Sequence, residues 1–241
     1  MGQYTLNVEI DDTWVDYFTQ HEYHFCFARV IRGASGEHIS NVIAHSDIVM
    51  PSIQVTLKDD FAMAASSQGF SSGTKIALAT PHRRVDKGQS ATLPSWDAGL
   101  TKSDSDSAPR DGFLFDTTPA AAAVLIQSVN GKNRPVYITP HGVMGQSSKE
   151  PIVPLPRVAV WFQRDVEIGT MMDAWMRKAF FVPMGTDGSI STVLYDAKGC
   201  WHVVGQPIDY THGRFAKHLA GVMSPLSDKA SGMSGSGDMM F

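Results

Sequence analysis

Apolar and polar residues alternate one by one in several short stretches of this chain. A two-residue period places apolar side chains on one face of a β-strand and polar side chains on the other. In residues 4–10, the clearest stretch, the shared face holds Tyr4, Leu6, Val8 and Ile10. Similar stretches, bounded by Gly, Pro, Ser or Asp residues, predict strands at residues 53–57, 75–79 and 158–163.

Residues 23–31 show a different pattern, with apolar side chains on both predicted faces of a strand. Phe25 and Phe27 would lie on one face, and Cys26 and Ala28 on the other. Such a strand needs cover on both sides. Later strands are predicted at residues 191–195 and 199–203, whereas residues 171–180 fit helical spacing and strand alternation about equally.

These patterns predict an all-β protein with two packed, mainly antiparallel sheets in a β-sandwich. At 241 residues, a single domain spanning residues 1–226 is within the size range of such folds. The stretch near residues 97–118 contains many polar and turn-forming residues and predicts a long surface loop. Residues 215–223 predict a short C-terminal helix, and the Gly/Ser/Met-rich residues 227–241 predict a separate tail.

Composition narrows the range of partners. Charged residues make up 18% of the chain and the formal net charge is −4, so no nucleic-acid partner is expected. No apolar run approaches the roughly 20 residues of a membrane span, and the start lacks a signal-peptide pattern, which predicts a cytoplasmic location. Cys26 and Cys200 are expected to be reduced core thiols. A disulfide between them is the alternative and would require an oxidising compartment.

Motifs of familiar enzyme classes do not occur in the sequence, which has neither a nucleophile elbow nor a phosphate-binding glycine loop. His21 and His24 are three residues apart, and a strand would send their imidazoles to opposite faces, which disfavours zinc binding. The nine histidines leave open a metal site assembled from distant strands. Asp165 and Glu167 would share one face of a strand, as a glycosidase carboxylate pair requires, but neighbouring Arg164 favours a solvated face.

Aromatic residues offer the largest potential binding surface. The chain has 5 Trp, 12 Phe and 6 Tyr residues, whose flat faces can sandwich an aromatic ligand. We therefore place a candidate ligand-binding site at Trp161 and Trp201, with Arg164 and His202 as polar anchors. The alternative for each ring is a place in the hydrophobic core.

The most distinctive segment is residues 161–172, which reads Trp-Phe-Gln-Arg-Asp-Val-Glu-Ile-Gly-Thr-Met-Met and precedes the predicted strands at 191–195 and 199–203. This combination resembles uncharacterised fungal β-sandwich proteins, over roughly the last 90 residues, with shorter similarities near residues 70–75 and 87–90. The resemblance implies a cytosolic fungal β-sandwich without an established activity. It also suggests a similarity to mushroom chromoproteins, which hold a small aromatic pigment.

Three functions follow as alternatives. The first is a non-enzymatic protein that binds a small ligand, such as a non-covalent aromatic chromophore, and it predicts visible absorbance. The second is a lectin or a lipid-binding, cytolysin-like protein, which predicts binding to sugars or vesicles. The third is a metal-dependent enzyme, which predicts a bound metal ion. A homo-oligomer formed through a strand edge or the tail is compatible with each of them.

Overall fold

The alternating stretches fold mostly as β-strands, and several extend beyond their sequence pattern. The computed structural model describes residues 2–34, 36–172, 179–185 and 187–205. Within these ranges it has one helix, α1 (Asp12–Gln20). Its strands are β1 (Gln3–Ile10), β2 (Tyr23–Arg32), β3 (His38–Ile39), β4 (His45–Ile48), β5 (Ser52–Ser66), β6 (Arg83–Val85), β7 (Gln89–Leu93), β8 (Thr101–Asp104), β9 (Phe113–Thr117), β10 (Ala122–Val129), β11 (Lys132–Ile138), β12 (Ser148–Arg164), β13 (Phe180–Pro183), β14 (Ile190–Tyr195) and β15 (Trp201–Val203).

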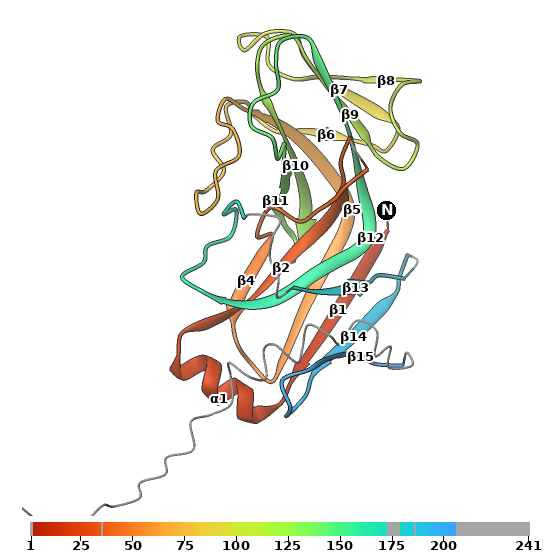
Figure 1. Cartoon of the computed structure of the whole chain (residues 1–241). Helices are drawn as coiled ribbons and strands as arrows, with labels where there is room; N and C mark the ends of the chain where they lie inside the picture. The colour runs from red at the N-terminus through yellow and green to blue at the C-terminus, as the bar shows by residue number, and fades with distance from the viewer. Residues whose placement is uncertain (1, 35, 173–178, 186, 206–241) are drawn as a thin grey trace, which may run out of the picture. The chain divides into compact units, whose positions relative to one another are not determined.

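These strands form two sheets (Figure 1). The first sheet has the order β11-β10-β5-β1-β14-β15, with β6 also paired to β5. The second has the order β3-β2-β12-β9-β7-β8, with β13 paired to β12 and β4 to β2. Among the described strand pairs, β1 with β14 and β7 with β9 are parallel, and the others are antiparallel. The predicted all-β fold with two mainly antiparallel sheets is confirmed.

Strand β12 is long enough to join the two halves of the second sheet. Residues 148–152 pair with β9, and residues 153–164 pair with β2. Three prolines, Pro151, Pro154 and Pro156, lie within it, and the register with β2 shifts between Pro154 and Val158. Proline has no N–H to donate to a ladder, which explains why the pairing is irregular at this point.

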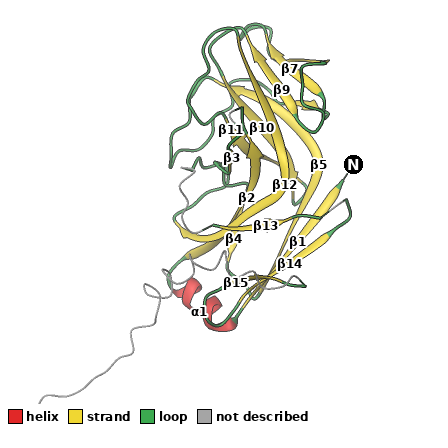
Figure 2. Ribbon diagram, turned by 45° about the vertical axis from the view of Figure 1, so that its right-hand side comes forward, coloured by secondary structure: helices red, strands yellow, loops and turns green. Residues whose placement is uncertain are grey.

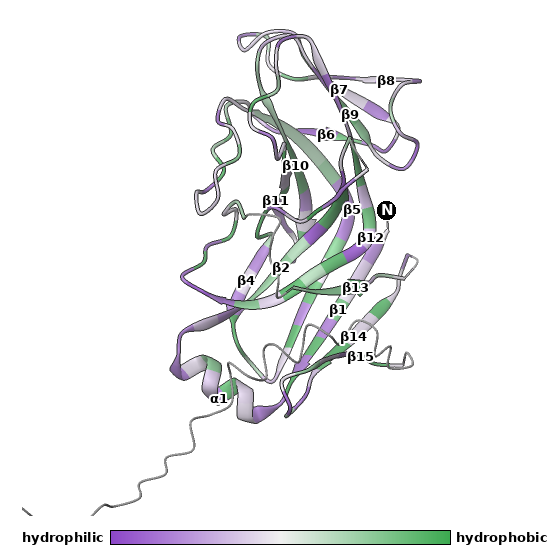
Figure 3. Ribbon diagram, viewed as in Figure 1, coloured by the Kyte–Doolittle hydropathy of each residue, from purple (hydrophilic) through white to green (hydrophobic). Residues whose placement is uncertain are grey.

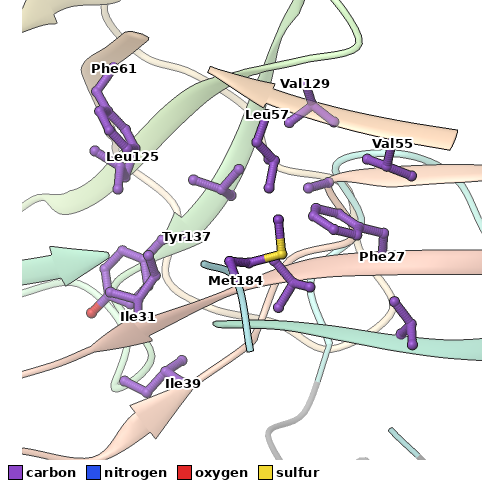
Figure 4. Close-up of a cluster of buried hydrophobic side chains, with 14 of the residues drawn as sticks. Phe27, Ile31, Ile39, Val55, Leu57, Phe61, Leu125, Val129, Tyr137 and Met184 are labelled. Carbon is purple, nitrogen blue, oxygen red and sulfur yellow. The ribbon is translucent and has the colours of Figure 1, made fainter. Parts of the chain in front are cut away.

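Apolar side chains fill the space between the sheets. Phe27 and Ile31 enter this core from β2, and Leu57 and Leu125 enter it from β5 and β10 (Figure 4). Hydrophobic and hydrophilic residues alternate along β1 in Figure 3, as its sequence predicts. Burying apolar surface stabilises the fold by about 25 cal/mol per Å², so this core is the main source of stability.

The outer sheet faces are covered as well, which confirms the two-sided burial predicted for residues 23–31. Cys26 and Ala28 pack with Trp161 in a second cluster, while Phe25 and Phe27 belong to the main core. A third cluster contains alternate residues of β5 and β10, among them Ala64 and Val124. Loop segments supply the remaining cover, since Val42, Met171, Phe70 and Ile76 pack in this third cluster.

One polar network crosses the core. The hydroxyl of Tyr137 donates to Oε1 of Glu150 at 2.6 Å, and Oγ1 of Thr139 donates to Oε2 at 2.6 Å. Thr139 in turn accepts a hydrogen bond from the backbone N–H of Ala123 at 2.8 Å. Since Tyr137 lies on β11 and Glu150 on β12, the network links the first sheet to the second.

Three expectations about the elements need correction. Helix α1 was not among the predicted elements. It is drawn in red in Figure 2. It begins after Asp11, whose side chain accepts from the N–H of Thr13, and it buries Phe18. The predicted loop near 97–118 contains strands β8 and β9. The predicted strand at 75–79 is wrong, because this segment bonds irregularly to the end of β5 through Ala77 and Ala79.

The described residues all belong to one compact unit, Met1–Ile208. The predicted C-terminal helix at 215–223, the tail at 227–241 and most of the ambiguous segment at 171–180 lie outside the described residues. Cys26 and Cys200 are both free thiols. Across the described ranges, no helix is both long and apolar enough to cross a membrane.

Candidate functional site

An open depression of about 540 Å³ lies beside the C-terminal end of β12. Its apolar lining comes from Ile43, Val166, Met171 and Met172. Its polar lining comes from the side chains of Ser72, Lys75, Gln163, Asp165, Glu167 and Thr170. The volume is within the range of small-molecule sites, which is roughly 300–1,000 Å³.

The backbone around the depression is held by hydrogen bonds between segments that are distant in sequence. Gly73 N–H donates to Met171 O and Met171 N–H donates to Thr74 O, both at 2.8 Å. On the other side, Ile43 N–H donates to Thr170 O at 3.1 Å, and Met172 N–H donates to Asn41 O at 2.8 Å. Residues 169–172 are therefore fixed between two neighbouring segments, which gives the depression a defined floor.

Asp165 makes the turn that ends β12. Its φ of +52° is in the left-handed region, where Asp is tolerated better than most residues. The sequence predicted that Asp165 and Glu167 would share one face of a strand. This prediction is wrong, because β12 ends at Arg164, although both residues line the depression. Gly169, at φ +84°, makes the second reversal and returns the chain toward residues 41–43.

The polar side chains at the rim carry both signs of charge. Lys75 Nζ lies 3.0 Å from Glu167 Oε2, and the two side chains are 64% and 74% exposed. An ion pair this exposed contributes little to stability, so either group can exchange it for a ligand at low cost. Oε1 of Gln163 accepts from the indole N–H of Trp161 at 3.0 Å, which directs the amide NH₂ group of Gln163 away from Trp161.

Trp161 packs against residues that line the depression. It is 2% exposed and packs with Cys26, Ile43 and Met172, two of which also line the depression. Trp161 itself lines a smaller neighbouring crevice of about 30 Å³, together with Phe181. Burial raises the pKa of the Cys26 thiol to about 12, so this cysteine is a packing residue and not a nucleophile.

The sequence-predicted site residues fall into two separate places. Arg164 is exposed at the end of β12, next to Gln163. Trp201 lies on β15 and stacks on Phe162, with ring centroids 5.2 Å apart. Since Trp161 and Phe162 are consecutive in β12, their side chains point to opposite faces. The structure therefore does not bring Trp161 and Trp201 together.

Trp201 belongs to an aromatic cluster, which we define as Trp14, Phe18, Phe162, Phe180, Tyr195 and Trp201. The ring of Trp201 stacks on Phe180 at 5.9 Å as well as on Phe162, and Phe162 stacks on Phe18 at 4.1 Å. Tyr195 packs against Trp201 at 4.9 Å. These rings largely pack on one another and connect α1 to the strands, so they stabilise this end of the sandwich.

His202 stabilises the hairpin between β14 and β15. Its Nε2 lies 2.7 Å from Asp196 Oδ2, while Asp196 Oδ1 accepts from the backbone N–H groups of Lys198 and Cys200, both at 2.9 Å. Burial alone would raise the pKa of Asp196, but hydrogen bonds from Cys200, His202 and Lys198 outweigh it and the pKa is lowered. Asp196 therefore stays ionised and orients the imidazole.

Sequence reasoning missed Ser72, Lys75 and Thr170 as site residues. The similarity noted at residues 70–75 was the only signal in this region, and it did not connect the segment to residues 163–172. Within the described part of the chain, no group of three or more His, Cys, Asp or Glu residues is arranged to hold a metal ion. His212, one of the histidines considered for such a site, lies outside the described residues.

No protein-family model, curated protein or solved structure matches this chain. The resemblance to fungal β-sandwich proteins and chromoproteins therefore stays a prediction from the residues that suggested it.

Proposed function

We propose that this protein binds a small, hydroxyl-rich molecule, such as a saccharide, in the depression beside β12. The observation that carries the proposal is the combination of carboxylate, ammonium and amide groups around an apolar floor in a space of about 540 Å³. Asp165 and Glu167 can accept hydrogen bonds from ligand hydroxyls, and Lys75 and Gln163 can donate them. The apolar lining can pack against C–H groups of the ligand.

The same lining argues for a hydroxyl-rich ligand over a flat pigment. Among the described residues that line the depression, none is aromatic. The rings that would hold a pigment are those of the aromatic cluster, where they already pack on one another. The lining of the depression therefore favours the sugar-binding alternative, and we still propose a non-enzymatic protein that binds a small ligand.

A glycan array probed with the fluorescently labelled full chain tests the proposal, followed by calorimetric titration with the best-bound free saccharide. Asp165→Asn is the most informative variant, because Asn also tolerates a positive φ and the backbone turn is kept. We expect this variant and Glu167→Gln each to weaken binding about 10–100-fold, as loss of a hydrogen bond to a charged group does.

Glu9→Gln serves as the control, since Glu9 is an exposed carboxylate on β1 outside the depression. It should bind as the unchanged protein does. Absence of binding to any saccharide on the array, or equal binding by all three variants, would contradict the proposal. A visible absorption band in the natively purified protein would support a pigment instead.

A further inference from the structure

Several polar side chains occupy one region between the two sheets. Arg29 lies on β2 between Phe27 and Ile31, which both belong to the main core, so alternation directs its side chain inward. On the facing sheet, Asp59 lies between the core residues Leu57 and Phe61 of β5. Figure 4 shows the side chains of Phe27, Ile31, Leu57 and Phe61 in the main core.

Two further polar residues adjoin Asp59 in the first sheet. Tyr4 is paired with Leu57 across β1 and β5, and Gln127 is paired with Phe61 across β10 and β5. Gln127 is fully buried. The ladder between Gln127 and Ser128 shifts its register, and this bulge brings Lys58 O within 3.0 Å of Gln127 Nε2.

Each of three side chains here has buried polar atoms without a hydrogen-bond partner among the described residues. They are Nε and Nη1 of Arg29, Oδ1 of Asp59 and Oε1 of Gln127. Arg29 is only 4% exposed. The other ends of Asp59 and Gln127 are held in place, because Asp59 Oδ2 lies 2.9 Å from Lys87 Nζ and Gln127 Nε2 binds Lys58 O. Each buried polar atom without a hydrogen-bond partner lowers the stability of the folded protein, so a bound molecule that pairs with these atoms would stabilise it.

The charges in this region do not balance. Arg29 and Lys87 are cationic and Asp59 is anionic, and Asp59 is already in contact with Lys87. Burial lowers the pKa of the Arg29 guanidinium to about 10, and the negative charge of Asp59 opposes this shift only in part. The positive charge of the buried Arg29 therefore remains without a neutralising contact among the described residues. An anion beside Arg29 would remove this imbalance.

We infer that Arg29, Asp59 and Gln127 bind a small oxyanion that still carries a proton, such as hydrogen phosphate or bicarbonate. An unprotonated oxygen of the anion would accept from Nε or from Nη1 of Arg29, which lie on opposite edges of the guanidinium group. Its hydroxyl would donate to Oδ1 of Asp59 or Oε1 of Gln127, which a fully deprotonated anion cannot do. The side chain of Asp59 is 16% exposed and that of its partner Lys87 is 39% exposed, so this ion pair lies between Arg29 and the solvent.

The site predicts selectivity by protonation, because sulfate has the charge and shape of phosphate but no proton to donate near neutral pH. Thermal unfolding of the full chain is measured with sodium phosphate, bicarbonate, sulfate or chloride at constant ionic strength. We expect the melting temperature to rise with the logarithm of the anion concentration above Kd, by roughly 5 °C at 100 times Kd, with phosphate or bicarbonate and not with sulfate.

Variants decide whether the effect comes from this site. Arg29→Gln should lose the response, whereas Arg83→Gln, which changes an exposed arginine on β6, should keep it. Asp59→Asn should gain a response to sulfate, since an amide can donate where the carboxylate cannot. Asp59→Asn also supplies the decisive test if Arg29→Gln does not fold. An equal response of the wild type to sulfate and phosphate would indicate binding at the surface and would overturn the inference. No response to either anion would indicate that water alone occupies the site, and would overturn it as well. The inference also fails if Asp59→Asn leaves the selectivity between phosphate and sulfate unchanged.

Discussion

The buried carboxylate of Glu150 gives the sharpest test of the packing between the sheets. It is 6% exposed and accepts hydrogen bonds from Tyr137 and Thr139, both at 2.6 Å. Tyr137→Phe removes one donor and leaves the ring in place. A hydrogen bond to a charged group is worth about 1.5–3 kcal/mol, so we expect the free energy of unfolding to fall by about 2 kcal/mol. For a unit of this size, that loss lowers Tm by roughly 4–8 °C.

The effect should depend on pH. Burial raises the pKa of Glu150 above the ordinary 4.5, although hydrogen bonds from Thr139 and Tyr137 oppose the shift. Glu37 adds to the increase and His141 opposes it. Because the folded-state pKa is above the unfolded-state value, the stabilising contribution is complete below pH 4.5 and is lost as pH rises through the folded-state pKa. Glu150→Gln should therefore remove this decline.

Urea unfolding followed by tryptophan fluorescence, between about pH 4 and pH 8, measures both effects. Tyr137→Phe should cost more above the folded-state pKa of Glu150, where it leaves an ionised carboxylate with one donor fewer, than at pH 4. Tyr23→Phe is the matched control, because no hydrogen bond from the Tyr23 hydroxyl to a described residue is present, and we expect it to be nearly neutral. A loss below about 0.5 kcal/mol for Tyr137→Phe, or the same loss at every pH, would refute this reasoning.

Two further predictions concern the hairpin between β14 and β15. Gly199→Ala should destabilise the protein by roughly 1–3 kcal/mol, measured by urea unfolding, because φ is +75° and a Cβ would lie 2.9 Å from Trp14 Cζ2. Gly131→Ala, at φ +72° with open space, isolates the backbone strain and should cost less; equal losses would exclude the clash. Because the folded-state pKa of Asp196 is below the ordinary value of 3.8, ionised Asp196 contributes to the free energy of unfolding above pH 3.8. This contribution is lost as pH falls through the folded-state pKa. Asp196→Asn should therefore flatten the acid side of the stability profile, and an unchanged slope would contradict that role.

Strong alternation made much of the fold predictable. The strands β1, β2 and β14, the N-terminal part of β5 and the C-terminal part of β12 were expected, because one face, or both, carries a continuous apolar row. Strand β8 was missed because all four of its residues are exposed, and its polar side chains therefore give no periodic signal. Helix α1 was missed although Asp11 offers an N-cap, because it is only nine residues long and Phe18 is its one buried residue.

The candidate site was less accessible to sequence reasoning. Arg164 and Trp161 adjoin it, and the carboxylates of Asp165 and Glu167 were recognised as a pair. Lys75 lies at the site because an isolated β-bridge pairs it with Thr170. Residue spacing cannot predict a contact between segments so far apart in the sequence. Trp201 and His202 were grouped with Trp161 because all are near aromatic strands, but strand alternation places Trp161 and Phe162 on opposite faces.

The parallel pairing of β1 with β14 has a consequence for synthesis of the chain. Strand β1 pairs with β5 along one edge and with β14 along the other, so one neighbour is made early and the second about 185 residues later. Until residues 190–195 leave the ribosome, β1 presents an unpaired edge with apolar side chains beside it. Contacts between distant segments slow folding, and open strand edges promote aggregation. Nascent chains interrupted before β14 would therefore be a natural target for chaperones.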